Sequence, residues 1–239
     1  MMTITTILVW TILYTRAIYC SQSGISSIFA MENLNQTNKI VDKNSIGTFK
    51  TESTRKCAFY CLQNLACMAY FYRQNTTECR LMSVNTPGNN GKWKDDMGWR
   101  YYNVYESTCP PMDGFNQNRK ASLCYQYFDD LKNVYEADIT CRRNGGQLLR
   151  VQSQLQQTHL MTYLDFYNEN LVYIQGNDST KEGTWSFDDG QLMKYFNWSP
   201  TTPFGHDAKD HLAMNKASSY GWEETDGSTL GGFLCEMKI

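Results

Sequence analysis

The sequence predicts an α+β protein made of two small, disulfide-rich domains. Its 239 residues contain nine cysteines that form no repeated Cys-x-x-Cys pattern of the zinc-binding kind. Disulfides in an oxidising compartment are therefore favoured. Four of the cysteines lie between residues 57 and 79, around one predicted helix and two predicted strands. The pair Pro110-Pro111 then stops regular structure and separates this group from a second half with two predicted helices and several short strands.

Charge and motif content exclude several classes of function. The formal net charge is −2, so the chain lacks the basic stripe of a nucleic-acid-binding protein and the polybasic segment of a membrane-surface protein. Gly-x-Ser-x-Gly, His-Glu-x-x-His and Walker motifs are absent from the sequence, and no cysteine is expected to stay free as a nucleophile. We therefore expect a protein that is not an enzyme.

The N-terminus has the pattern of a signal peptide. Residues 4–14 form an apolar run of 11 residues, which is shorter than the roughly 20 needed to span a bilayer. Small residues follow near Ala17, so we assign residues 1–20 to a signal peptide, with an uncleaved signal anchor as the alternative. Cleavage after Cys20 leaves eight cysteines, an even number that agrees with a secreted, extracellular protein.

Sequons predict surface glycans if the chain is secreted. The expected sites are Asn35, Asn75 and Asn177. A fourth sequon at Asn197 lies inside an aromatic stretch, which makes it the least suitable acceptor.

The first domain is predicted to pack one helix on an antiparallel sheet. Cys57 and Cys61, four residues apart, share one face of a helix that a serine or threonine just before it can cap. Residues 67–72 alternate like a strand, residues 75–82 turn back as a second strand, and residues 99–105 form a closing strand. Four cysteines alone allow three disulfide connectivities.

The spacing Cys57-x3-Cys61-x5-Cys67, with an aromatic strand and then Cys79, resembles the PAN/apple domain family. We place this domain at residues 21–107. The resemblance implies the disulfides Cys57–Cys79 and Cys61–Cys67. Domains of this family bind proteins or sugars, so the resemblance leaves the ligand open.

The second half is predicted to contain two capped helices followed by short strands. Residues 133–143 carry apolar positions at helical spacing and end at a Gly-Gly pair. Ser153 begins a capping-box pattern and a second helix. In the stretch Gly183–Trp198, aromatic and polar residues alternate as in a half-buried strand, and we assign Trp185 and Trp198 to the core.

Landmarks along residues 109–239 together resemble the C-type lectin-like domain. They are, in order, Cys109, Cys124, Ala137-x3-Cys141, Gly145-Gly146-Gln147-Leu148, Gly183-x-Trp185-x-Phe187, Asn197-Trp198, Gly221-Trp222 and Phe233-Leu234-Cys235-Glu236. The resemblance implies two helices, short antiparallel strands, a long loop region and the disulfides Cys109–Cys124 and Cys141–Cys235. A further internal disulfide of the family is missing, because the matching positions hold His211 and non-cysteine residues around 225–228.

Sugar-binding members of this family hold a calcium ion through a Glu-Pro-Asn or Gln-Pro-Asp tripeptide and an Asn-Asp pair that follows a tryptophan. The matching positions here read Thr202-Pro203-Phe204 and Trp222-Glu223-Glu224. Phenylalanine has no oxygen and threonine has one uncharged hydroxyl, so two glutamates are the strong ligands for an ion that takes about six to eight oxygens. The resemblance therefore implies a degenerate calcium site.

A neighbouring loop offers additional ligands. Asp207, Asp210, Glu223 and Glu224 are the candidate calcium ligands, and His206 and His211 would suit a transition metal instead. The alternative is a solvated polar loop that holds no metal, so calcium is left open.

Exposed aromatic rings are a second way to bind sugars. Phe204, Tyr220 and Trp222 lie near the expected ligand face, although burial in the core is the commoner fate of such residues. The candidate ligand-binding residues are Thr202, Phe204, Trp222, Glu223 and Glu224. We predict a secreted glycoprotein that binds carbohydrate on glycans or glycoproteins. The alternative is calcium-independent binding of extracellular proteins by both domains.

Overall fold

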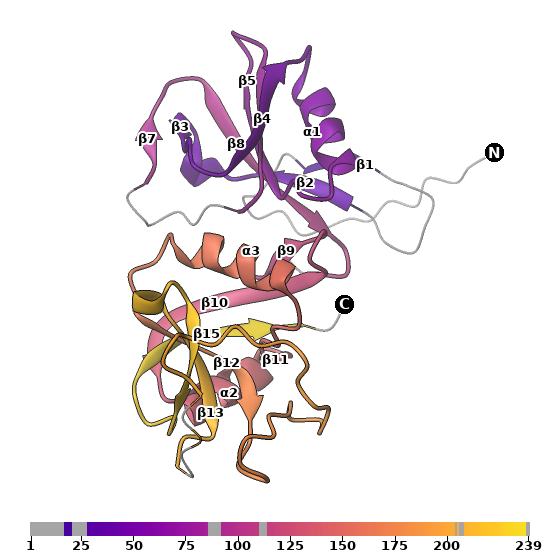
Figure 1. Cartoon of the computed structure of the whole chain (residues 1–239). Coiled ribbons are helices and arrows are strands. Elements are labelled where there is room, and N and C mark those ends of the chain that lie inside the picture. Colours follow the sequence, from indigo (N-terminus) through magenta and orange to yellow (C-terminus); the bar gives the residue numbers. More distant parts are fainter. Residues whose placement is uncertain are drawn as a thin grey trace, which may run out of the picture.

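Two α+β domains follow one another along the chain (Figure 1). The computed structural model describes residues 17–20, 28–85, 92–109, 114–203, 205 and 208–237. Four disulfides join the pairs that the two resemblances imply, which are Cys57–Cys79, Cys61–Cys67, Cys109–Cys124 and Cys141–Cys235. The predicted fold class is therefore confirmed.

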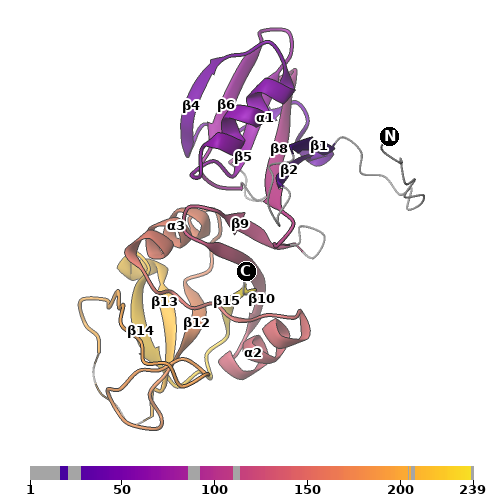
Figure 2. The same cartoon turned by 90° about the vertical axis from the view of Figure 1, so that its right-hand side faces the viewer.

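The first domain packs one helix on a six-stranded antiparallel sheet (Figure 2). Helix α1 (Thr54–Gln63) begins at Ser53, whose Oγ accepts a hydrogen bond from Lys56 N at 3.3 Å. The buried Cys57 and Cys61 on its inner face tie it to the sheet. The strands in sheet order are β1 (Ala17–Cys20), β2 (Ile28–Glu32), β8 (Trp99–Glu106), β5 (Ala69–Arg73), β6 (Glu78–Met82) and β4 (Ser45–Lys50). The short elements beside this sheet are η1 (Leu34–Gln36), β3 (Lys39–Ile40) and β7 (Lys94–Asp95).

The second domain has a seven-stranded sheet with helices α2 (Val134–Arg143) and α3 (Gln154–Leu164). Asn133 and Ser153 cap these helices by accepting the backbone N–H three residues later, at 2.9 and 3.3 Å. The strands in sheet order are β14 (Gly221–Thr225), β13 (His211–Asn215), β12 (Leu171–Asn177), β15 (Gly231–Glu236), β10 (Leu123–Lys132) and β9 (Asn116–Asn118), with β11 (Gln147–Leu148) on β15. The pairing of β12 with β15 is parallel, so the expected all-antiparallel arrangement is corrected there.

The stretch Gly183–Trp198 keeps the predicted alternation without forming a continuous strand. It makes isolated bridges through Ser186, and Trp185 and Phe187 are buried on the same side. Trp198 packs against the core but is only partly buried, which corrects its assignment as a core residue.

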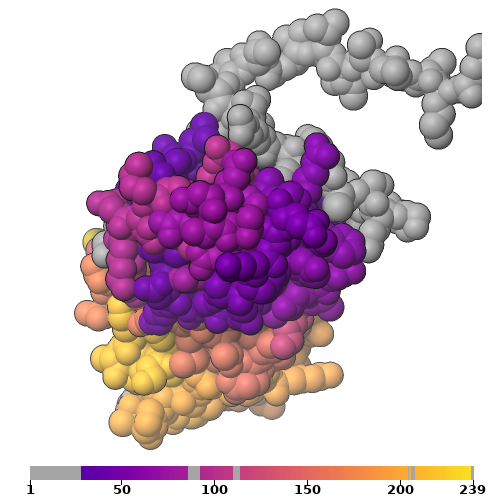
Figure 3. All heavy atoms as spheres, turned by 90° about the horizontal axis from the view of Figure 1, so that it is seen from above, coloured from indigo at the N-terminus to yellow at the C-terminus, as the bar shows by residue number. Residues whose placement is uncertain are grey.

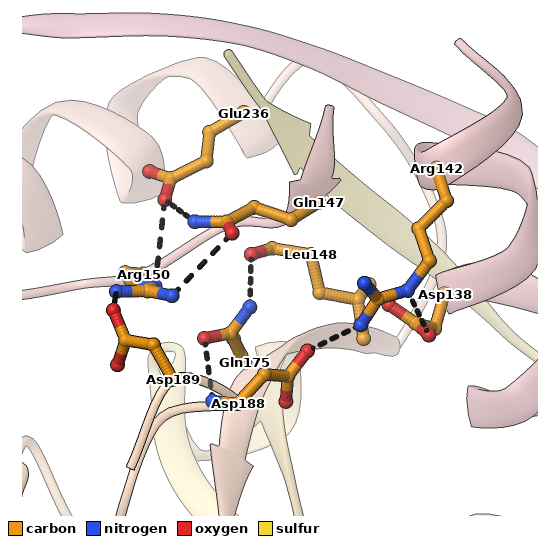
Figure 4. A network of polar contacts seen from close by, with 9 residues as sticks. All are labelled: Asp138, Arg142, Gln147, Leu148, Arg150, Gln175, Asp188, Asp189 and Glu236. Carbon is orange, nitrogen blue, oxygen red and sulfur yellow. Dashed lines mark hydrogen bonds and ion pairs between the residues drawn. The ribbon is translucent and has the colours of Figure 1, made fainter. Parts of the chain in front are cut away.

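Two arginines hold this stretch on the domain (Figure 4). The Arg150 guanidinium, 5% exposed, donates to Asp189 Oδ2 at 2.6 Å and lies 4.9 Å from the centre of the Phe187 ring. Arg142 donates to Asp188 Oδ2 at 2.8 Å. The two adjacent aspartates therefore point to different arginines and fix the turn between them, rather than flanking a common substrate.

Each domain inserts an apolar side chain into the core of the other. Met68, just before β5, is 1% exposed and packs in the same cluster as Tyr163 of α3. Phe166, just after α3, is 3% exposed and packs with Phe71 of β5. In the view from above, the first domain lies over the second and covers most of it (Figure 3).

Arg119 of the second domain caps the helix of the first. Its guanidinium donates to four main-chain oxygens at 2.8–2.9 Å, those of Cys61, Leu62, Asn64 and Cys67. The C-terminal turn of a helix leaves its carbonyls unpaired and carries partial negative charge, so a cation is favourable there. The orientation of the two domains is therefore fixed by hydrogen bonds as well as by apolar contacts.

The N-terminal prediction falls mostly on residues 1–16, which lie outside the described part of the chain. Within residues 1–20, β1 pairs with β2. No helix among the described residues is long and apolar enough to cross a membrane.

Candidate ligand-binding site

The segment that carries Thr202 is bound to the start of β14. Ser199 N donates to Trp222 O at 3.0 Å, and Trp222 N donates to Asn197 O at 2.7 Å. The Thr202 hydroxyl donates to the same Trp222 O at 2.7 Å, and the Thr202–Pro203 peptide bond is cis. The hydroxyl proton of Thr202 therefore holds the loop in place and leaves only its oxygen lone pairs for a ligand.

Two of the predicted stacking rings lie in the core. Trp222 is 0% exposed, and its Nε1 donates to Gln157 Oε1 at 2.9 Å. Tyr220 is 5% exposed. A buried ring has no face for a sugar, so the expectation that Trp222 and Tyr220 form a stacking surface is corrected. The third ring, Phe204, lies outside the described residues.

Three other aromatic rings are partly exposed beside this loop. Tyr195, Phe196 and Trp198 pack against the core without being buried in it. The rings of Phe196 and Trp198 are stacked, with centroids 5.3 Å apart and an interplanar angle of 10°. Sequence reasoning missed Tyr195 and Phe196. The available signal was three aromatics within four residues, more than one buried face of an extended segment can accommodate.

The side chains of Glu223 and Glu224 do not lie on the same face of their strand. Successive side chains of a strand point to opposite faces, and both residues belong to β14. The Glu223 carboxylate accepts a hydrogen bond from Asn215 Nδ2 at 2.8 Å. Glu224 is 7% exposed and contributes to the field at Asp178. The structure thus separates the two glutamates that the sequence proposed as joint ligands.

Asp178 is a buried carboxylate that sequence reasoning missed. It is 1% exposed at the end of β12, and its Oδ2 accepts a hydrogen bond from Gly183 N at 2.9 Å. Its Oδ1 has no hydrogen-bond partner within the described residues. Burial raises the pKa of Asp178, the Gly183 N–H opposes this rise, and the negative charges of Asp210 and Glu224 add to it.

The described residues do not fit a calcium ion. Of the candidate metal ligands and their neighbours, His206 and Asp207 lie outside the described residues. Among the residues that the structure does describe, no three His, Cys, Asp or Glu side chains are grouped so that they could hold a metal. Calcium takes about six to eight oxygens, and no such group of carboxylates is assembled among the described residues.

His211 occupies the place of the missing disulfide. It lies opposite Thr225 across the β13–β14 pair. A Cβ on Gly227 would lie 2.9 Å from His211 Cδ2 and 2.3 Å from Val134 Cγ1. The imidazole and a glycine thus fill the space together, and Nε2 lies 3.2 Å from the Tyr135 hydroxyl rather than in a metal site.

Replacing Asp178 by Asn should raise the free energy of unfolding at pH 7 by about 1 kcal/mol, because the buried negative charge is removed. The folded-state pKa lies above the ordinary 3.8, so ionisation of Asp178 destabilises the fold. The gain should therefore disappear as the pH falls below 3.8, because Asp178 is then protonated in both the folded and the unfolded state. Urea unfolding at pH 7 and pH 3 measures this, with Asp95→Asn at an exposed position of β7 as control. A gain that is equal at both pH values would contradict the assignment.

Comparison with known proteins identifies both halves. The family model of the C-type lectin domain matches residues 130–237, and that of the PAN domain matches residues 34–109. A C-type lectin of Micrurus corallinus is 31% identical over 138 residues, which are 55% of this chain and 85% of that protein. Regenerating islet-derived protein 4 of Mus musculus is 31% identical over 121 residues, covering 49% of this chain and 76% of that protein.

A third relative carries a more specific name. The galactose-specific lectin nattectin of Thalassophryne nattereri is 29% identical over 136 residues, which cover 56% of this chain and 82% of that protein. All three relatives match roughly half of this chain and most of their own length. The protein therefore belongs to the C-type lectin family and carries an N-terminal PAN domain in addition.

Proposed function

We propose that this protein is a secreted, non-enzymatic recognition protein whose lectin domain binds carbohydrate without calcium. The observation that carries the proposal is the pair of stacked rings, Phe196 and Trp198, which lies partly exposed beside the Thr202 loop. Sugars present apolar C–H faces that pack on such rings, while their hydroxyls need hydrogen-bonding side chains nearby. Kinship with proteins named as lectins, one of them galactose-specific, supports the same ligand class.

Polar groups close to these rings suit sugar hydroxyls. The Tyr195 hydroxyl donates to Gln154 Oε1 at 3.1 Å at the start of α3. The partly exposed Thr202 hydroxyl lies 3.0 Å from the Oγ of Ser199, which is itself buried beneath it. These groups are held by their own hydrogen bonds, so they would meet a ligand with little loss of side-chain freedom. Thr202 remains a proposed ligand-binding residue through its oxygen.

Secretion and glycosylation belong to the same proposal. Eight cysteines are paired in disulfides, which persist in oxidising compartments. Asn35 and Asn75 are exposed, as glycan acceptors need to be, and Asn177 is partly exposed. A signal peptide over residues 1–20 would deliver the chain to that compartment, and its cleavage would remove β1, the edge strand that pairs with β2.

Protein binding by the PAN domain is the second candidate function. Helix α1 presents Phe59 and Tyr60 outward, 46% and 37% exposed, and Leu65 just beyond it is 59% exposed. Grouped apolar side chains on a surface are typical of protein-binding sites. The partner would be an extracellular protein.

A glycan array probed with the full secreted chain tests the proposal. We expect binding to neutral glycans that persists in the presence of a calcium chelator. Loss of glycan binding in the presence of chelator would show that binding requires calcium, and it would overturn the proposal of calcium-free binding. Absence of binding to every glycan would favour the second candidate, binding of proteins.

A further inference from the structure

A pocket of about 440 Å³ lies at the boundary between the two domains. Figure 1 shows α3, which forms one wall, on the side of the lectin domain that faces the PAN domain. Its lining includes Lys43 and Asn44 of the PAN domain and Thr162, Asp165, Lys216 and Tyr220 of the lectin domain. The pocket exists only because the two domains are held in one orientation.

Positive charge exceeds negative charge at this pocket. Lys43 forms an ion pair with Asp165, and Lys92 lies 3.9 Å from the same carboxylate. Lys216 adds a third ammonium to this group. Burial lowers the pKa of Lys92; Asp165 opposes this, and the charges of Lys43 and Lys216 lower it further. One carboxylate thus faces three lysines, which leaves a field that attracts anions.

A second carboxylate, that of Glu169, reduces this positive excess without cancelling it. Its Oε2 accepts a hydrogen bond from the neutral Tyr127 hydroxyl at 3.1 Å, which does not offset its charge, so two carboxylates stand against three lysines. Lys216 donates to the main-chain oxygen of Tyr167, a neutral group. The three lysines therefore exceed the two carboxylates by one positive charge.

Two buried hydrogen-bond donors that line the pocket lack a partner. The Tyr220 hydroxyl belongs to a side chain that is 5% exposed, and Asn44 Nδ2 is fully buried. Neither atom has a hydrogen-bond acceptor within the described residues. An unsatisfied buried polar group destabilises the folded state. A ligand oxygen that accepts from either donor would satisfy it.

The backbone around the pocket is strained. Asn44, Ser219 and Tyr220 all have positive φ, at 70°, 55° and 61°, and all three line it. For a bulky residue such as Tyr220, this left-handed conformation is an outlier. Such conformations cluster at ligand sites, where the surrounding structure maintains them.

We propose that this interdomain pocket binds an acidic saccharide through its sulfate or carboxylate oxygens. The lysines supply charge, the Tyr220 hydroxyl and Asn44 amide donate hydrogen bonds to the oxyanion, and Thr162 faces the sugar hydroxyls. A volume of about 440 Å³ exceeds what a bare sulfate needs and admits a sugar ring. The site is separate from the rings of Phe196 and Trp198, so it does not depend on carbohydrate binding at those rings.

Calorimetry on the full chain at low salt tests the proposal with three probes. These are a sulfated, uronate-containing disaccharide, the same disaccharide after desulfation, and inorganic sulfate. We expect the sulfated disaccharide to bind and salt to weaken the binding. Retained affinity after desulfation would assign the contact to the carboxylate, and lost affinity would assign it to the sulfate. Equal affinity for inorganic sulfate would overturn a saccharide ligand.

Two variants locate the binding. The double variant Lys43→Gln with Lys216→Gln should weaken binding of the disaccharide by about tenfold or more. Tyr220→Phe removes an unsatisfied buried hydroxyl, so it should keep or raise the melting temperature and still lose affinity about threefold. Lys50→Gln, an exposed lysine at the end of β4, is the charge-matched control.

Binding that is equal in all these variants, or absent in the unmodified chain, would overturn the proposal. Phe196→Ala separates it from the first site, because that change should leave the acidic disaccharide bound. Loss of acidic-saccharide binding in Phe196→Ala would place the ligand at the aromatic rings instead.

Discussion

Replacing Cys141 and Cys235 together by alanine should lower the free energy of unfolding of the lectin domain by about 4–5 kcal/mol. The bond joins residues 94 positions apart, so its loss restores much conformational freedom to the unfolded chain. Both cysteines are 0% exposed and pack with Tyr173 and Phe233, so the change also leaves a small cavity. A loss of this size is a large part of the stability of a small domain.

Removal of Cys109–Cys124 is the matched control for that experiment. It closes 15 residues rather than 94, for which chain entropy predicts a smaller loss of about 3 kcal/mol. Urea unfolding followed by tryptophan fluorescence measures both variants under the same conditions. A larger loss for the short loop than for the long one would contradict the argument from loop length.

Arg119→Met should cost about 3 kcal/mol and uncouple the two domains. Methionine keeps much of the apolar stem but leaves four main-chain oxygens at the end of α1 without their charged donor. Burial lowers the pKa of Arg119, and the charge of Glu106 opposes this, so the guanidinium already bears a desolvation cost that its hydrogen bonds offset. We expect the PAN domain to melt at a lower temperature than the lectin domain.

Scanning calorimetry measures that separation. The unmodified chain should give one transition, because Met68 and Phe166 also join the two cores. Arg143→Met, at an exposed position near the end of α2, is the matched control and should change nothing beyond a few tenths of a kcal/mol. If Arg119→Met still unfolds in a single transition at the same temperature as the unmodified chain, the apolar contacts alone hold the two domains together.

Patterns among neighbouring residues were sufficient to predict where the helices begin, and the family cysteine spacing was sufficient to predict the disulfide pairs. The caps at Asn133 and Ser153 follow from side chains that accept a hydrogen bond three residues later. The family cysteine spacing implied the pairs that the structure contains. These features depend on neighbours in sequence or on one strong landmark each.

Contacts between segments far apart in the sequence could not be predicted from such patterns. Nothing in the residues around Arg119 indicates that it reaches the end of α1, some 55 positions away, since its partners are main-chain oxygens that any sequence supplies. Met68 and Phe166 look like ordinary apolar residues until the two domains are docked. The interdomain pocket has the same origin, because Lys43 and Lys216 meet only across that interface.

The landmarks predicted which segments meet around Trp222, but not which of their side chains are buried. The loop after Trp198 and the start of β14 do lie together, as the landmarks implied. Trp222 is buried, however, because its indole N–H has a partner in Gln157, which no local pattern indicates. Asp178 was overlooked because a single aspartate after a strand usually forms a solvated turn, whereas here it is buried.

Calorimetric titration of the best array glycan tests the central claim, calcium-free carbohydrate binding at the stacked rings. We predict the same Kd in calcium and in chelator, and a loss of about tenfold for Phe196→Ala, which removes one face of the stack. Leu192→Ala, an apolar residue 56% exposed on the same stretch, should bind like the unmodified chain. Binding that vanishes in chelator, or that Phe196→Ala leaves intact, would contradict the account.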